Sequence, residues 1–230
     1  MSQKIIKGSF FSAWKEALML LKQEQLQKDS FGKRAYHEAA NLQVMISSSL
    51  PPIERLFHYF AQHLGLVYPC TLDLEQFILK KTLGPGFKYS YGNRLFSYGT
   101  KKLNQIDEYV IPLLLDNPSS KRATAMLWYP SVDAKAYKQD TPSLVLIHFK
   151  IRNQKLFVTA VTRSMDFLFG WPAHCYQLSI LQRYVYQKVA LSKHQLALGS
   201  ITTITFSAML YQDHEPLLEE LFVQTKKLAS

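Results

Sequence analysis

Cysteine and histidine are the side chains that most readily act as nucleophiles or bases near neutral pH, and one such pair is adjacent in this chain. Cys175 directly follows His174 in a stretch that we expect to be helical. Neighbours on a helix point about 100° apart, so these two side chains would not face one substrate together. We therefore interpret Cys175 as a small buried apolar residue rather than an activated thiol.

The cysteine count limits the other chemistry. Cys70 and Cys175 are the only cysteines in 230 residues, which is too few for a disulfide framework and favours the cytoplasm. No histidine stands near them at the spacing of zinc ligands, so no metal site is expected. The N-terminus lacks the apolar stretch of a signal peptide, and no apolar run approaches the roughly 20 residues of a membrane span.

Charge is the remaining chemical signal. The chain has 27 Lys and Arg against 17 Asp and Glu, a net charge of +10, and a basic surface attracts phosphates of any kind. The basic residues are scattered rather than gathered into one tract, which favours solubility or a small anionic ligand over nucleic acid. Nucleic-acid binding is the rival interpretation of the charge.

The elements that must position these side chains mix helices and strands. With 47% hydrophobic and 19% charged residues, residues 1–230 are expected to form one packed domain. The spacing of apolar residues predicts helices over 12–27, 53–64, 74–83, 106–115 and 173–190. Alternation and β-branched runs predict strands over 41–48, 124–128, 143–149, 155–161 and 199–206. Strands and helices do not alternate strictly, so the fold class is α+β with a mixed sheet.

Four motifs, in order and at suitable distances, carry a resemblance. They are GFKYSYGNRL at 86–95 with NQI at 104–106, NPSSKRA at 117–123, DTPSL at 140–144, and TRSMD at 162–166 with GWP at 170–172 behind it. Over roughly residues 29–215 the chain resembles thymidylate synthase and its pyrimidine nucleotide hydroxymethylase relatives, most closely the short archaeal-type members.

This resemblance implies a three-layer α+β subunit with a mixed sheet, which forms a homodimer by stacking two sheets. The implied substrate is a nucleotide-like small molecule, and the implied cofactor is 5,10-methylenetetrahydrofolate. In the family a cysteine thiolate attacks C6 of the pyrimidine and makes C5 nucleophilic toward the one-carbon unit. The thiolate adds and later leaves, so one hard step becomes two easier ones.

The resemblance assigns roles to residues that match the motifs. Asp166 matches the acid that contacts the pterin ring, and Tyr91 and Arg94 match the element that lines the site. A further functional acid of the family corresponds to Asp73 or Glu75, and the sequence leaves these two alternatives open.

The anion site is matched in part. Arg163 stands at a phosphate-binding arginine and is followed, as in the family, by Ser164. Lys121 and Arg122 stand where the partner subunit offers two arginines, and a lysine keeps the charge but loses the bidentate fork. Phe31 stands where another arginine is expected; the neighbouring Lys33 or Arg34 could substitute for it.

Three further positions depart from the family. Ser143 stands at the nucleophilic cysteine, and a serine hydroxyl is a poor nucleophile for addition to a ring without a strong base beside it. His174 stands at the asparagine that reads the pyrimidine edge, although at a helix start it could instead cap or pack. Met209 stands at the histidine that helps Tyr211 hold the ribose hydroxyl. Ser143 is therefore a ligand contact, a nucleophile or a plain small residue.

Together these changes indicate a different substrate, a different mechanism or lost catalysis. The first hypothesis is an atypical one-carbon transferase, whose acceptor is nucleophilic enough to react without a thiolate. The second is a catalytically silent relative that keeps the scaffold and a ligand pocket.

Overall fold

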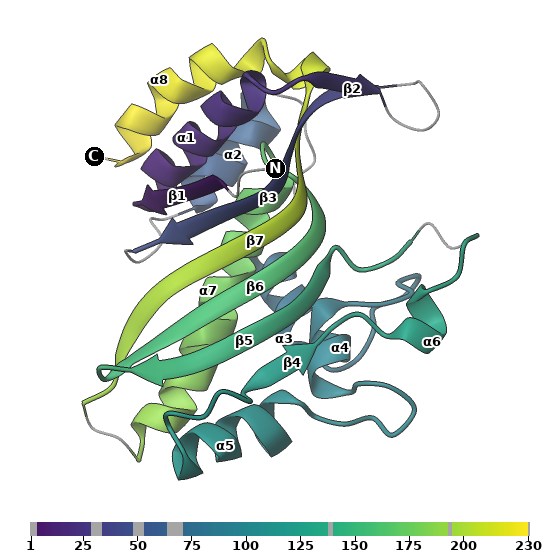
Figure 1. The fold of residues 1–230 in the computed structure, drawn as a ribbon, viewed down its shortest axis with the longest axis vertical. Helices are drawn as coiled ribbons and strands as arrows, with labels where there is room; N and C mark the ends of the chain where they lie inside the picture. The colour runs from purple at the N-terminus through teal and green to yellow at the C-terminus, as the bar shows by residue number, and fades with distance from the viewer. Residues whose placement is uncertain are drawn as a thin grey trace.

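The centre of the molecule is one seven-stranded sheet in the order β1-β3-β7-β6-β5-β4, with β2 paired to β3 (Figure 1). The computed structural model describes residues 4–28, 34–47, 53–63, 71–137, 140–192 and 195–229. Its strands are Lys4–Gly8 (β1), Leu26–Lys28 (β2), Ala35–Ile46 (β3), Thr124–Met126 (β4), Leu144–Arg152 (β5), Lys155–Asp166 (β6) and Ala197–Tyr211 (β7).

The sheet is mixed. β1 runs parallel to β3 and β6 runs parallel to β7, whereas the β2–β3, β3–β7, β4–β5 and β5–β6 pairs are antiparallel. Parallel neighbours need a long crossover, and the helix α7 (Gly170–Ala190) supplies it between β6 and β7. The α+β class with a mixed sheet is thus confirmed.

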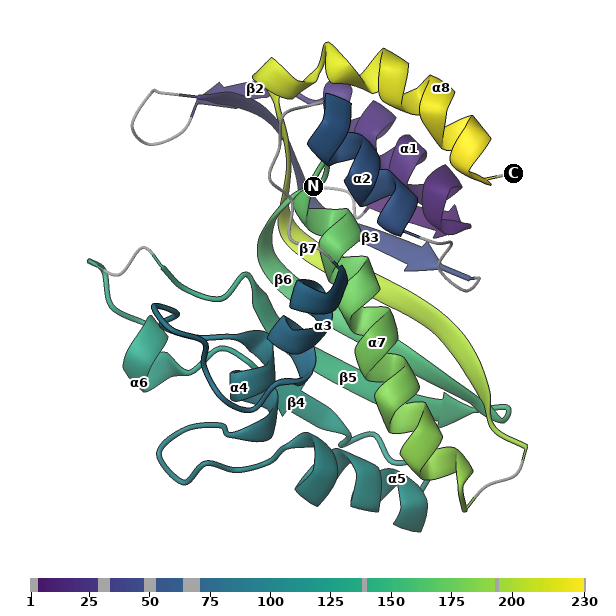
Figure 2. The same ribbon diagram turned by 180° about the vertical axis from the view of Figure 1, so that it is seen from behind.

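Helices cover one face of this sheet, as Figure 2 shows. The remaining helices are Phe10–Lys22 (α1), Glu54–His63 (α2), Thr71–Leu79 (α3), Tyr91–Phe96 (α4), the π-helix Ile106–Val110 (η1), Ile111–Asp116 (α5), Pro130–Asp133 (α6), the 3-10 helix Gln212–His214 (η2) and Leu217–Ala229 (α8). α7 packs on β6 and β7, and α3 and α5 pack against α7. No helix of the described residues is long and apolar enough to span a bilayer.

Two apolar clusters form the core, and α7 contributes to both. The first contains Trp14 and Trp171, whose buried indole N–H groups donate to the Phe167 carbonyl at 2.6 Å and to the Thr203 hydroxyl at 2.9 Å. The second contains Tyr91 and the later turns of α7. The first turns of α7 pack in the first cluster and its later turns in the second, so one helix joins the two halves of the core.

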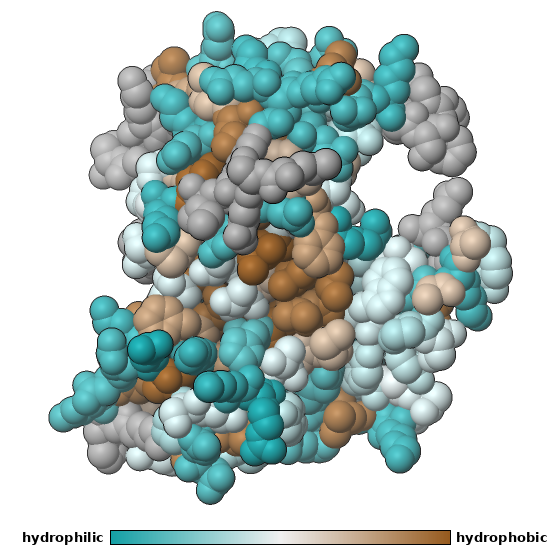
Figure 3. Space-filling view, viewed as in Figure 1, coloured by the Kyte–Doolittle hydropathy of each residue, from teal (hydrophilic) through white to brown (hydrophobic). Residues whose placement is uncertain are grey.

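The other face of the sheet carries no helix among the described residues (Figure 1). Thr162 on β6 donates to Thr205 on β7 at 2.9 Å on the buried side. Successive residues of a strand point to opposite faces, so Arg163 and Phe206 point to the uncovered side. Phe206 is 51% exposed there, and Figure 3 shows apolar side chains gathered over the middle of this face.

Several element boundaries differ from those predicted. The helix predicted over 12–27 ends at Lys22, because Leu26–Lys28 pairs with β3 instead. The strands predicted over 155–161 and 199–206 extend to Asp166 and Tyr211, where they pair with each other and with β3. β1, α4 and α8 were not predicted, and tertiary pairing and packing decide these short or terminal elements.

Candidate active site

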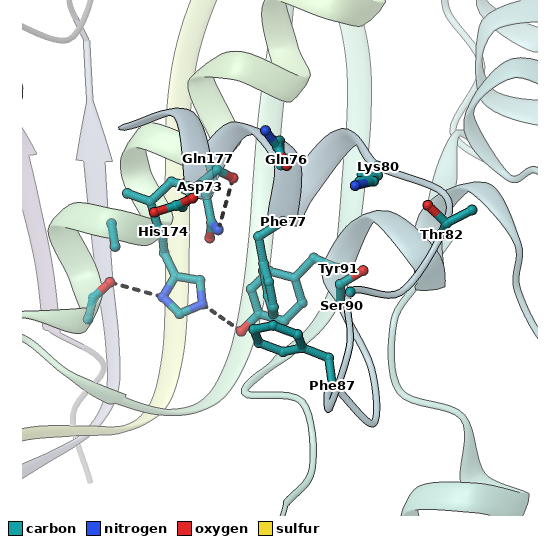
Figure 4. A pocket seen from close by; sticks show the side chains of 14 residues that line it. Asp73, Gln76, Phe77, Lys80, Thr82, Phe87, Ser90, Tyr91, His174 and Gln177 are labelled. Atoms are coloured by element: carbon teal, nitrogen blue, oxygen red, sulfur yellow. Dashed lines mark hydrogen bonds between the residues drawn. The ribbon is translucent and has the colours of Figure 1, made fainter. Parts of the chain in front are cut away.

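A cavity of about 610 Å³ lies between α3, the loop that follows it, α4 and the start of α7 (Figure 4). Small-molecule sites in proteins commonly have volumes of roughly 300–1,000 Å³. Its walls are mostly apolar and aromatic, with a few polar groups. The residues that line it are Asp73, Leu74, Gln76, Phe77, Lys80, Thr82, Gly84, Phe87, Ser90, Tyr91, Gly170, Ala173, His174 and Gln177.

Tyr91 and His174 form a hydrogen-bonded pair in this cavity, with 2.7 Å between the Tyr91 hydroxyl and His174 Nε2. His174 Nδ1 lies 3.0 Å from the carbonyl of Gly170. A carbonyl can only accept, so Nδ1 carries the proton and Nε2 accepts from Tyr91. Burial lowers the pKa of His174 to about 4 and raises the pKa of Tyr91. The pair is therefore neutral at physiological pH.

Local sequence explains how Tyr91 reaches this position. The Ser90 hydroxyl accepts from the Asn93 N–H at 2.9 Å and caps α4, so the helix begins at Tyr91. A Cβ added at Gly92 would lie 2.5 Å from the carbonyl oxygen of Lys80. Only glycine permits this close approach of α4 to the end of α3, which places Tyr91 against the cavity.

Tyr91 also connects the cavity to the start of β5. The backbone N–H of Leu144 faces the Tyr91 oxygen and partly offsets the rise in its pKa. Ser143 is the preceding residue, so it lies next to the wall of the cavity, although it is not among the residues that line it.

The Ser143 hydroxyl donates to the Ser164 carbonyl. The Arg163 N–H donates in turn to the Ser143 carbonyl at 2.9 Å. Within the described ranges no histidine or carboxylate is hydrogen-bonded to the Ser143 hydroxyl. A serine in this setting has no base to remove its proton, which argues against a nucleophilic role.

The Arg163 guanidinium holds the segment before β5. Its Nε donates to the Pro142 carbonyl at 3.0 Å, one terminal nitrogen to the Thr141 carbonyl at 3.1 Å, and the other to the Ser164 hydroxyl at 3.2 Å. Arginine has five N–H donors, so donors are left over for an anion on the exposed side. Phosphate binding by Arg163 and Ser164 stays a prediction.

Asp166, at the end of β6, is a second polar centre. Its Oδ1 accepts from the N–H groups of Leu168 at 2.8 Å and Phe169 at 3.4 Å. Burial raises the pKa of Asp166, and these hydrogen bonds together with the nearby His214 and Arg34 oppose the shift. The carboxyl group thus lies in a largely buried position beside the first turn of α7.

Arg34, the residue before β3, lies beside this centre. Its guanidinium lies 3.7 Å from the ring centroid of Tyr211 and donates to both carboxylate oxygens of Asp213 at 2.8 Å. Arg34 also donates to His214 Nε2 at 3.2 Å. As the structure stands, Arg34 is engaged with Asp213 rather than open to a phosphate. Phe31 and Lys33 lie outside the described residues.

Other residues singled out in the sequence lie apart from the cavity. Arg94 is buried and donates to Asp133 at 2.9 Å in an ion pair that is 7% and 0% exposed. It is therefore paired in the interior and is not among the residues that line this cavity, and its role in a site stays a prediction. Lys121 and Arg122 are exposed just before β4.

The two alternatives for the family's further acid are separated by the structure. Asp73 lines the cavity, whereas Glu75 accepts from the Tyr176 hydroxyl at 2.6 Å. Cys175 is fully buried, and burial raises the pKa of its thiol, which agrees with its interpretation as an apolar residue. Cys70 lies outside the described residues. The described residues hold no cluster of metal-ligating side chains.

Sequence reasoning missed Gln177, Phe77 and Phe87, which line the cavity. One signal was available, because Gln177 follows His174 by three residues on a predicted helix and thus shares its face. His214 was also missed, although it follows Tyr211 closely in sequence. The aromatic residues gave no signal, since the chain is rich in Phe and Tyr that mostly fill the core.

Comparison with known proteins identifies one family. The sequence model of the family described as thymidylate synthase matches residues 73–229. The proposed thymidylate synthases of Methanosarcina mazei and Methanocaldococcus jannaschii are 43% identical over 129 residues and 34% identical over 134 residues; each match covers 56% of this chain, and 55% and 58% of the relative. The thymidylate synthase of Bacillus atrophaeus is 33% identical over 107 residues, 46% of this chain and 45% of that protein. The matched part of the chain thus spans about half the length of these relatives.

Proposed function

This chain belongs to the thymidylate synthase family, and we propose that it transfers a one-carbon unit to a nucleotide-like or other biosynthetic acceptor without a cysteine nucleophile. The observation that carries this proposal is the cavity that joins Tyr91 and His174 to the start of β5. Residues of the motif at 86–95 and of the GWP motif at 170–172 line it, and the start of the strand after the motif at 140–144 adjoins it through Tyr91. The polar pair is buried, and its hydrogen bond offers a path for a proton between the two groups.

The residues fit the cofactor that the family uses, 5,10-methylenetetrahydrofolate. The cavity is large enough for a flat ring system and has aromatic side chains at Phe77 and Phe87. Asp166 and Gly170, at and after the end of β6, would hold the pterin end. When bound, this cofactor supplies a one-carbon unit at the oxidation level of formaldehyde.

The absence of a thiolate restricts the acceptor. The Ser143 hydroxyl donates a hydrogen bond to a backbone carbonyl and has no base beside it, so it cannot add to an electron-poor ring carbon. The acceptor atom must then be nucleophilic by itself. Tyr91 can accept the proton that leaves this atom as it passes its own to His174 Nε2 along the 2.7 Å hydrogen bond. The residues thus orient the acceptor and pass its proton on, while the acceptor provides the nucleophile.

We propose a homodimer through the uncovered face of the sheet. Val161, Ile204 and Phe206 project from that face, and a dimer would bury them. Arg163 projects beside Phe206, so a partner subunit would lie next to Arg163. In such an assembly the exposed Lys121 and Arg122 could supply cations to the partner's site. On its cysteine usage we place the protein in the cytoplasm.

The test is turnover with 5,10-methylenetetrahydrofolate carrying a labelled methylene carbon. Purified protein is incubated with pyrimidine nucleotides, nucleosides and free bases, and transfer of label to the acceptor is measured. Labelled product that disappears in Tyr91→Phe supports the proposal. No transfer to any acceptor by folded protein contradicts it.

A second candidate is a catalytically silent relative that binds a ligand. The hydrogen bond from Ser143 to the Ser164 carbonyl favours it, because a hydroxyl committed to a carbonyl has no catalytic use. The same incubation distinguishes the two candidates, because any turnover would show that the protein is not catalytically silent.

A further inference from the structure

The cavity raises the question of which side chain reads the edge of a bound ring, since His174 stands at the position that would do so in the family. Both of its ring nitrogens are already used, Nδ1 by Gly170 and Nε2 by Tyr91. To read a ligand edge, His174 would have to give up one of these buried hydrogen bonds. Leaving a buried polar group unpaired is costly, so His174 is poorly suited to recognise a ligand edge.

Gln177 is one helical turn further along α7 and lines the same cavity. Its side-chain Nε2 donates to the Leu74 carbonyl at 3.3 Å, and the residue is 4% exposed. Figure 4 shows the carboxamide beside the His174 ring, at the end of the cavity away from Phe87. No described residue donates to the carboxamide oxygen. One N–H and this oxygen are therefore left for a ligand.

The walls around Gln177 suit a flat ring. Phe77 and Phe87 have ring centroids 6.0 Å apart at 64°, and the Phe77 and Tyr91 rings are 5.1 Å apart at 75°. Phe87 is 58% exposed at the mouth of the cavity. An exposed ring at the mouth of an apolar cavity is available to stack on a flat guest.

The charged side chains at the mouth of the cavity favour an uncharged ligand. Asp73 and Lys80 lie at opposite ends of α3 and both line the cavity (Figure 4). Charges of both signs attract neither an anion nor a cation strongly. The interior offers the neutral Tyr91–His174 pair and the neutral carboxamide, and a buried charge without a partner would be costly there.

We infer that Gln177, rather than His174, recognises the edge of an uncharged planar ring bound in this cavity, where the ring presents an adjacent hydrogen-bond donor and acceptor. The edge of a lactam or of an aminopyrimidine has this form, and a carboxamide complements it with one N–H and one oxygen. The Leu74 carbonyl holds one amide N–H and so fixes the orientation of the carboxamide. Gln177 is thus a specificity-determining residue of the proposed site. The inference rests on the proposed function only in taking this cavity as the ligand site.

The experiment measures binding without turnover. Deoxyuridine monophosphate, deoxycytidine monophosphate and folate each carry such an edge, and N3-methyldeoxyuridine monophosphate carries a blocked one. Their affinities are measured by calorimetry for the wild type, Gln177→Leu and the matched control Gln76→Leu. Gln76 lines the exposed rim of the same cavity.

At least one unblocked ring is expected to bind the wild type and to lose about tenfold or more in affinity in Gln177→Leu, since two hydrogen bonds are removed. Gln76→Leu is expected to change that affinity less than twofold, and the blocked ring to bind the wild type and Gln177→Leu equally weakly. The affinities of the three unblocked ligands show whether the cavity prefers a uracil, a cytosine or a pterin ring.

The inference is overturned if folded protein binds none of the unblocked rings, or if Gln177→Leu and Gln76→Leu weaken binding equally. A cooperative thermal transition, measured for each variant, ensures that folded proteins are compared. Binding that depends on Gln177 without any turnover would contradict the proposed one-carbon transfer and leave this inference intact.

Discussion

The site has two halves, which differ in the hydrogen-bond partners of their polar side chains. The cavity half surrounds Tyr91 and His174. The strand-end half surrounds Ser143, Arg163 and Asp166. In the cavity half, the buried side chains of Tyr91 and His174 hydrogen-bond to each other. In the strand-end half, side chains mostly bond to backbone groups at the ends of β5 and β6. The first arrangement leaves groups that can exchange a proton, whereas the second mainly fixes the course of the chain.

The same contrast separates two arginine ion pairs. Arg94–Asp133 joins α4, the helix of Tyr91, to α6 and is almost fully buried, whereas Arg34–Asp213 lies at the strand ends with side chains 40% and 60% exposed. Burial removes the screening by water, so breaking a buried pair leaves a costly unpaired charge. The distribution of stability between the two halves should follow this difference.

Asp133→Ala is expected to have the largest effect on the free energy of unfolding. The change leaves the Arg94 charge buried and also removes the acceptor of the Tyr129 N–H at 2.8 Å. We expect a loss of about 3–5 kcal/mol in the free energy of unfolding. Urea unfolding of the variant and the wild type measures it. A loss below about 1 kcal/mol would mean that the pair is accessible to water.

The next effect is the pH dependence of stability caused by His174. Its folded pKa of about 4 lies below the ordinary value of 6.5, so between these values the unfolded chain binds a proton that the folded chain does not. Stability is therefore complete above about pH 6.5 and falls by about 3 kcal/mol as the pH drops to about 4. Unfolding free energies of wild type and His174→Asn at pH 7 and pH 4.5 test this. Equal pH dependence of the two proteins would show that the imidazole is not held neutral by burial.

Tyr91→Phe should have a smaller effect on stability and a larger one on activity. It leaves His174 Nε2 buried without its donor, at a cost of about 1–3 kcal/mol. It also removes the hydroxyl proposed to move the proton, so label transfer should fall by about 100-fold or more. Turnover that survives in this folded variant would place the proton transfer elsewhere.

Asp213→Ala tests the strand-end pair. Because both side chains of the Arg34–Asp213 pair are exposed to water, we expect a loss of less than about 1 kcal/mol, decreasing further in 1 M salt. Chemical unfolding at two salt concentrations is the measurement. A salt-independent loss as large as that of Asp133→Ala would remove the contrast between the two halves.

Ser143→Ala is expected to have the smallest effect, and this effect is on label transfer. The hydroxyl bonds only to a carbonyl among the described residues, so label transfer should change less than about threefold. A loss of 100-fold or more would make Ser143 a catalytic residue after all. Ser143→Cys complements this change, because release of tritium from C5 of a bound pyrimidine would show that the position still faces the ring.

The sequence by itself determined the family, the α+β class and the approximate place of most central elements. Motifs at 86–95, 140–144 and 162–166 are specific because their residue types serve turns, strand starts and polar contacts at fixed spacings. Long periodic segments such as α7 were predicted within a few residues, since a helix's buried face repeats along the sequence.

Tertiary structure decided what the site residues do. Nothing local distinguishes Arg94, buried with Asp133, from Arg163, exposed at a strand end, because burial depends on segments 39 and 21 residues away along the chain. The tautomer of His174 depends on the Gly170 carbonyl and on Tyr91, which is 83 residues distant. Hydrogen-bond partners and desolvation set the chemistry of a side chain, and both arise only when the chain has folded.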